Sequence, residues 1–216
     1  MNYSELTTAI QDYTENTFSA TDLSTFVEQA EQRIYNSVQF PSLRKNVTGT
    51  ATIGNKYLNC PNDFLSSHSL AVVDGSGNYE YLLNKDTNFI RQAYPNPTST
   101  GTPKYYAIYG PQSGDLRELT FILGPTPDAN YTVEMHYFYY PESIVTAGTS
   151  WLGDNFDSVL LYGSLVEAYT FMKGESDLLQ LYNAKYNEAL QLAKRLGDGL
   201  ERQDSYRSGQ ARIPVT

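Results

Sequence analysis

Two carboxylates that face each other across a cleft could hydrolyse a glycosidic bond, and the sequence offers one such set. Glu134 lies in an aromatic, strand-like segment, and Asp115 or Glu118 could supply the second acid. Glycosidases need two acids about 5 to 10 Å apart, one to protonate the leaving oxygen and one to act as nucleophile or base. Spacing along the chain does not set that distance, so a hydrolase built on Glu134 is kept only as an alternative.

The sequence contains little evidence for any other kind of catalytic, cofactor or metal site. His68 and His136 are the only histidines, Cys60 is the only cysteine, and none of them stands at the spacing of a metal-ligand pair. No Walker loop, dinucleotide-binding glycine motif or G-x-S-x-G serine elbow occurs. Residues 74–78 alternate oxygen side chains but lack the distal glutamate of an EF-hand, so a hairpin turn is expected there. The sequence therefore predicts no catalytic, cofactor-binding or metal-binding residues.

Aromatic residues are abundant, with 19 Tyr, 9 Phe and 1 Trp. Tyrosine is favoured at contacts that are half apolar and half wet, so tyrosines on strands suit a sugar-stacking platform or a protein interface equally well. Packing inside the protein explains any single one of them just as well. The candidates for such a surface are Tyr105, Tyr109, Tyr137 and Tyr139.

The charge balance argues against a protein that coats DNA. The 216 residues carry 15 Lys and Arg against 24 Asp and Glu, a net charge of -9, and no three basic residues are consecutive. An acidic wall would instead allow DNA to slide past without adhering. Glu5 and Asp12 precede any apolar run, and the uncharged apolar stretch 158–166 is too short to span a bilayer. We therefore expect a soluble, intracellular protein with no membrane partner.

Helical periodicity marks the first forty residues. The spacing predicts a helix over residues 3–16, with Asn2 and Glu5 as a capping box, and a second helix from Thr21 or Asp22 to the stop at Pro41. The pair would form a hairpin that buries one face and exposes an acidic one. The candidates for this acidic face, as a channel wall or a contact between subunits, are Glu5, Asp12, Glu15, Glu28 and Glu31. For any one of them, an ordinary solvated position is the alternative.

The following hundred residues predict short strands. Residues 48–58, with a Gly54-Asn55 turn, and residues 69–83, with a turn at 74–78, each suggest a hairpin. A short helix is expected over 86–94, and further strands over 105–109, 119–123 and 131–140. These elements predict a small antiparallel sheet system.

Helices return after Trp151. One is expected from Asp154 or Asn155 to Gly174, and another over residues 176–196. The apolar set of the second consists of Leu178, Leu181, Tyr182, Ala189, Leu192 and Leu196. The sequence therefore predicts an α+β fold. Its N- and C-terminal helical hairpins, residues 1–43 and 150–197, form a four-helix bundle, and residues 44–149 form an inserted β-rich lobe.

The last stretch, residues 198–216, loses the periodicity. A disordered terminus is one interpretation, and the other is an arm that becomes ordered on a partner's surface. The residues assigned to partner binding in this arm are Arg202, Tyr206, Arg207, Arg212, Ile213, Pro214 and Val215.

Several segments together resemble a known family. These are residues 31–45 (EQRIYNSVQFPSLRK), 121–127 (FILGPTP), 137–142 (YFYYPE), 151–156 (WLGDNF) and 162–168 (YGSLVEA). As a set they are similar to the head-to-tail adaptors of tailed bacteriophages, the group that includes tail tubular protein A. The resemblance covers nearly the whole chain and follows the same order of helices, β insertion, helices and tail.

The resemblance implies a non-enzymatic virion protein assembled in the host cytoplasm. It implies a twelve-fold ring of this chain beneath the portal protein, around a channel through which genomic double-stranded DNA passes without sequence-specific binding. The arm would hold the portal, and the strand tyrosines would face the next tail or nozzle protein. A carbohydrate- or receptor-binding tail module that uses those tyrosines remains the alternative.

Overall fold

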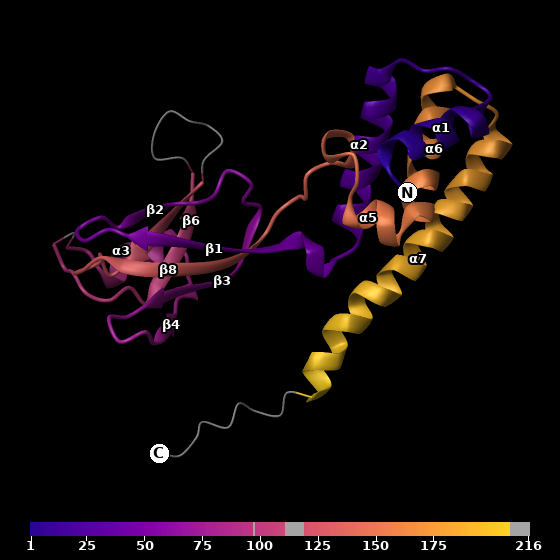
Figure 1. The fold of residues 1–216 in the computed structure, drawn as a ribbon. Helices are drawn as coiled ribbons and strands as arrows, with labels where there is room; N and C mark the ends of the chain where they lie inside the picture. Colours follow the sequence, from indigo (N-terminus) through magenta and orange to yellow (C-terminus); the bar gives the residue numbers. More distant parts are fainter. Residues whose placement is uncertain (97, 111–118, 208–216) are drawn as a thin grey trace. The chain divides into compact units, whose positions relative to one another are not determined.

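A computed structural model describes residues 1–96, 98–110 and 119–207, and the chain divides into two compact units (Figure 1). Met1–Leu43 and Tyr140–Thr216 form the helical unit, and Arg44–Tyr139 form the β unit. The β unit is thus an insertion between the two stretches of the helical unit.

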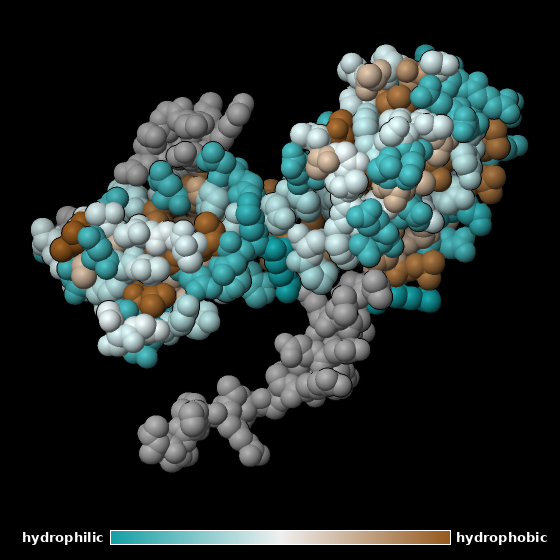
Figure 2. Space-filling model, in the orientation of Figure 1, coloured by the Kyte–Doolittle hydropathy of each residue, from teal (hydrophilic) through white to brown (hydrophobic). Residues whose placement is uncertain are grey.

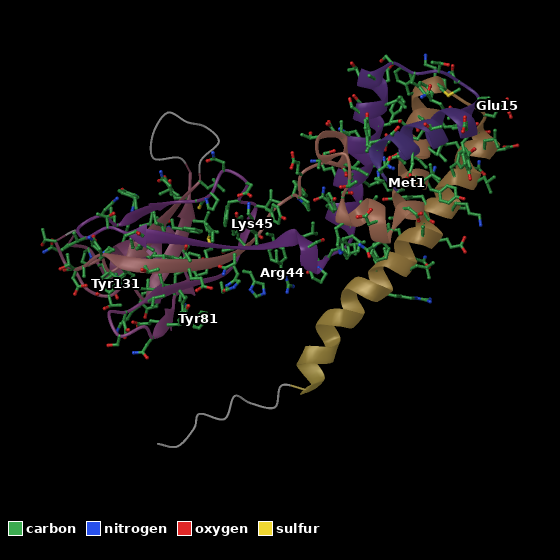
Figure 3. The ribbon with its side chains drawn as sticks, viewed as in Figure 1. Met1, Glu15, Arg44, Lys45, Tyr81 and Tyr131 are labelled. Atoms are coloured by element: carbon green, nitrogen blue, oxygen red, sulfur yellow. The ribbon has the colours of Figure 1, made fainter. Side chains whose placement is uncertain are left out.

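The helical unit begins with two capped helices. Asn2 and Glu5 form the expected capping box, in which each backbone N–H donates to the other side chain at 2.9 Å. The ammonium group of Met1 also donates to the carbonyl of Gly153, at 2.7 Å, which ties this end of the chain to α5 (Figure 3). The described elements of this unit are α1 (Tyr3–Thr14), α2 (Ala20–Ser37), the 3-10 turn η1 (Pro41–Leu43), α4 (Ile144–Ala147), α5 (Trp151–Asn155), α6 (Asp157–Met172) and α7 (Ser176–Arg207).

Helix α6 is the centre of the helical unit, and the predicted four-helix bundle of two hairpins is wrong. Helices α1, α2, α5 and α7 all pack against α6, and α1 and α2 do not pair with each other as a hairpin. The reason is that α6 is buried around most of its circumference rather than along one stripe. Its buried residues are Val159, Leu160, Leu161, Gly163, Ser164, Leu165, Val166, Ala168 and Tyr169. A bundle helix buries one face, whereas this helix is surrounded.

Helix α7 is longer than expected, and only part of its expected apolar set is buried. It continues past Leu196, through Gly197 and Gly199, to Arg207. A glycine costs about 1 kcal/mol in a helix, which neighbouring good helix formers offset. Its buried residues include Tyr182, Tyr186, Leu190 and Ala193, while Leu178, Leu181 and Leu192 of the expected apolar set are exposed.

The β unit consists of two four-stranded sheets that enclose one core. One sheet has the order β1-β8-β3-β4 and is antiparallel; the other has the order β2-β7-β6-β5, in which only β5 and β6 are parallel. The elements are β1 (Arg44–Ala51), β2 (Tyr57–Asn59), β3 (Ser66–Val73), β4 (Tyr79–Tyr81), β5 (Leu83–Asn84), α3 (Thr87–Ala93), β6 (Tyr105–Tyr109), β7 (Thr120–Gly124) and β8 (Tyr131–Phe138).

Successive side chains along a strand point to opposite faces of the sheet, so β7 takes part in two layers of apolar contacts. Phe121 and Leu123 of β7 point into the core between the sheets, while Ile122 packs with Ala107 and with Ile90 of α3 on the opposite face. The hairpin of β3 and β4 around residues 74–78 is confirmed. The expected hairpin of residues 48–58 is wrong, because β1 pairs with β8 and β2 pairs with β7.

Candidate interaction surfaces

The acidic residues expected on one face are divided between surface and interior. Glu5 caps α1, and Asp12 and Glu15 lie exposed at the carboxyl end of that helix, where Glu15 points away from the helices (Figure 3). Among the described residues, no cation pairs with Asp12 or Glu15. Negative charge at a helix carboxyl end opposes the helix dipole and costs about 0.3 to 1 kcal/mol. The negative charges of these two surface carboxylates are therefore not neutralised by any nearby cation of the described residues.

Glu31 is an interior residue. Its side chain is only 3% exposed and accepts a 3.0 Å hydrogen bond from the backbone N–H of Ile144. Burial raises the pKa of Glu31, hydrogen bonds from Ser143 and Ile144 oppose that rise, and the nearby charge of Glu28 adds to it. Glu28 itself is exposed on α2. Of the five acids, Glu31 thus connects α2 to the start of α4 inside the helical unit.

The four candidate tyrosines do not form one surface. Tyr137 is 1% exposed in the core of the β unit, where its hydroxyl donates to Asp63 at 2.8 Å. Tyr105 packs against Phe89 of α3, and Tyr139 is half-buried beside Tyr137. Tyr109 is the one that is mostly exposed, at 55%. The four tyrosines therefore share no face on which a glycan could stack.

A polar cluster on the outer face of the first sheet resembles a serine, histidine and acid arrangement. Ser69 Oγ lies 3.1 Å from His136 Nδ1, and His136 Nε2 lies 3.8 Å from Glu134 Oε1. The second distance is too long for a hydrogen bond, and Glu134 instead accepts one from Asn46 at 3.0 Å. Nearly half of the His136 side chain is exposed, so water has free access, whereas acyl transfer needs a preorganised, water-excluded site. The second acids proposed for a glycosidase, Asp115 and Glu118, lie outside the described residues.

A cavity of about 390 Å³ beside α3 is a feature that the sequence did not reveal. Its walls include Tyr57, Tyr94 and Ile122, and two cations, Lys56 and Arg91, line it without any acidic neighbour in the lining. A lining of this composition would suit an anionic group that carries an apolar part. The lining comes from β2, β7, α3 and the segment after α3, so no local motif marks it.

The surface of each unit is mixed on the face shown in Figure 2, with apolar residues scattered among hydrophilic ones. No helix within the described part of the chain is long and apolar enough to cross a membrane. The same residues contain no cluster of three His, Cys, Asp or Glu side chains that could hold a metal ion.

The residues assigned to the arm are only partly described. Arg202, Tyr206 and Arg207 belong to the last turns of α7 rather than to an extended segment. Arg212, Ile213, Pro214 and Val215 lie outside the described residues.

Comparison with known families identifies the chain. A family model described as "SU10 adaptor protein" matches residues 1–214. The chain belongs to the SU10 adaptor protein family. No curated protein matches the sequence. As a member of this family, the chain is a phage structural adaptor and a component of the virion, which agrees with the expected adaptor class. The closer likeness to tail tubular protein A is not confirmed.

Proposed function

We propose that this SU10 adaptor protein forms a ring between the portal and the tail of a phage virion, around the path of the DNA. The observation that carries this proposal is the family match, which extends over residues 1–214. The exposed acids at the end of α1, with a net charge of -9 for the chain, support a surface that DNA passes without binding. Its partners would be the portal protein, the next tail or nozzle protein and further copies of itself, with twelve as the expected number.

The carboxyl-terminal residues are the proposed portal contact. Arg202, Arg207 and Arg212 would form charge-assisted hydrogen bonds with acidic groups of the portal, and Ile213 and Val215 would provide an apolar anchor beside Pro214. Tyr206 has the amphipathic side chain that interfaces favour. Because α7 continues to Arg207, Arg202, Tyr206 and Arg207 lie on a helix rather than on an extended segment.

Electron microscopy of the protein mixed with its portal tests the ring. We expect rings on the portal vertex, and images that place the protein elsewhere in the virion contradict the proposal. Deletion of residues 208–216 leaves α7 and the rest of the described fold complete, so the shortened protein should still unfold cooperatively but attach to portals more weakly. If it joins portals as the full chain does, residues 212–215 are not part of the portal contact, and the ring is tested by the images alone.

A further inference from the structure

The outer side of α7 carries leucines that remain exposed in the described chain. Leu178, Leu181 and Leu192 are 37%, 51% and 59% exposed. Together with Lys185, Glu188 and Arg195 they form what we call the α7 seam. Figure 2 shows apolar residues along the outer side of this helix, separated by hydrophilic ones. Buried packing of α7 onto α6 uses the other residues of the helix, Tyr182 and Tyr186 among them.

The spacing of the seam indicates a helical partner. Its residues follow one another at alternating steps of three and four, from Leu178 through Leu181, Lys185, Glu188 and Leu192 to Arg195. This is the repeat by which two helices pack along a common line, because residues at these steps stay on one face of a helix. A strand or a loop would not match this repeat over such a length, about 26 Å of helix.

Because of the order of its residues, the seam of one copy is complementary to the seam of a second copy that runs antiparallel to it. Its midpoint lies between Lys185 and Glu188, so an antiparallel copy places Lys185 opposite Glu188 of the second copy. The same operation places Leu181 opposite Leu192, and Leu178 opposite Arg195, whose aliphatic stem can pack against the leucine. A parallel copy would instead place Lys185 opposite Lys185, and like charges in contact are unfavourable.

We propose that α7 pairs antiparallel with α7 of a second copy of this chain, through the α7 seam. Within one helix, Lys185 Nζ lies 3.3 Å from Glu188 Oε2, and the two side chains are 50% and 68% exposed. An exposed pair of this kind contributes little to stability, and lysine before glutamate is the less favourable order along a helix. Both groups are therefore free to pair across the interface, with the leucines on either side of them.

The proposed pair goes beyond the ring of the previous section. A twofold contact closes on two copies, whereas a ring needs two different surfaces on each copy. The α7 pair therefore describes the protein outside the ring, and its test needs no portal. One helix seam buries less than the roughly 1,200 Å² of a standard interface, so we expect weak association.

Charge exchange in the full chain tests the pair. Sedimentation velocity over about 10 μM to about 1 mM covers the range of a weak contact. The original protein should shift from monomer to dimer over this range. Lys185→Glu or Glu188→Lys alone should lower the association constant about tenfold, because each places like charges opposite each other twice per dimer. The double variant Lys185→Glu with Glu188→Lys should associate as the original does, and an equimolar mixture of the two single variants should form mixed dimers.

The matched control is Lys194→Glu, the same charge change on an exposed residue of α7 outside the seam. It should leave association unchanged. The proposal is overturned if the original protein is monomeric at every concentration, or if the single variants and Lys194→Glu behave alike. It is also overturned if neither the double variant nor the mixture restores the dimer.

Cross-linking tests the direction of the two helices. A copy with Leu181→Cys mixed with a copy with Leu192→Cys should form an oxidised dimer that joins the two different copies. Cys60 does not interfere, because it is buried. Dimers that join Leu181→Cys to itself, in place of the mixed product, would show a parallel pair and overturn the proposed geometry.

Discussion

The carboxylate of Glu31 on α2 accepts a 3.0 Å hydrogen bond from the backbone N–H of Ile144, 113 residues further along the chain. Ser143 caps α4 with its side chain and, beside the same carboxylate, opposes the rise in the pKa of Glu31. The contact joins the two stretches of the helical unit on either side of the β insertion. A buried acid at this position thus acts as a capping group for a helix that is distant in sequence.

Two substitutions of Glu31 should distinguish the contribution of its hydrogen bonds to stability from that of its charge. Glu31→Ala leaves the buried N–H of Ile144 without an acceptor, and we expect a loss of about 1 to 3 kcal/mol in the free energy of unfolding. Glu31→Gln keeps an oxygen for Ile144 and an amide for Ser143, so we expect a change of less than about 1 kcal/mol. Urea unfolding of the three proteins measures the difference. Equal losses in both variants would show that the hydrogen bonds to Glu31 are not what stabilises this site.

The buried charge of Glu31 predicts a dependence of stability on pH. Burial raises its pKa above the ordinary 4.5, so the folded protein keeps this proton to a higher pH than the unfolded chain does. Its favourable contribution is therefore complete below pH 4.5 and is lost as the pH rises through the raised pKa. Relative to Glu31→Gln, which has no such proton, the original protein should lose stability as the pH rises from 4.5 through the raised pKa of Glu31. A constant difference over this range would contradict the raised pKa.

Local signals in the sequence predicted local structure well. The capping box of Asn2 and Glu5 and the turn at residues 74–78 depend only on neighbouring residues, and both are present. Asp86 before the short α3 is a further example, since its side chain accepts from the N–H of Asn88. Each of these signals acts through hydrogen bonds within four residues, which the order of residues determines directly.

Long-range arrangement was less predictable for a physical reason. β1 pairs with β8 and not with β2, and this choice depends on how the two sheets pack around the core. The short turn at Gly54 is compatible with either pairing. On β8, Tyr137 and Phe138 are both aromatic, and only the register shows that Tyr137 points inward. On α7, leucines and tyrosines mark two faces, and the tyrosines cover α6 while Leu181 and Leu192 stay exposed. Residue type alone therefore did not show which face of each of these elements is exposed.

Gly124 allows α3 to lie close to β7, and a side chain there should disturb this packing. A Cβ at Gly124 would come within 2.9 Å of Ile90 Cγ2 and 3.1 Å of Tyr94 Cδ2. Gly124→Ala should therefore lower the free energy of unfolding by about 1 to 3 kcal/mol, although alanine is otherwise the more favourable residue in a strand. Gly49→Ala on β1 is the control, because a Cβ there meets no atom within 4 Å. Similar unfolding curves for the two variants would contradict the close contact.

Asp63 accepts hydrogen bonds from two side chains at one end of the core of the β unit. Its carboxylate accepts from Tyr137 Oη and from Lys45 Nζ, each at 2.8 Å. Partial burial opposes ionisation of Asp63, but the hydrogen bonds from Lys45 and Tyr137 outweigh it and lower its pKa. Because the folded pKa lies below the ordinary 3.8, the contribution of this carboxylate is present above that pH and is lost as the pH falls through the folded pKa.

Asp63→Asn at neutral pH should cost about 1 kcal/mol, since more than a third of the Asp63 side chain is exposed and solvent weakens the interaction. Tyr137→Phe removes the same hydrogen bond from the other side. Because the two changes share one interaction, the double variant should lose less than the sum of the single losses, by about 0.5 to 1 kcal/mol. Chemical unfolding of the four proteins at pH 7 and in acid measures this coupling, which should shrink in acid as Asp63 becomes protonated. Strictly additive losses at pH 7 would mean that Tyr137 is held by packing among the core residues and not by Asp63.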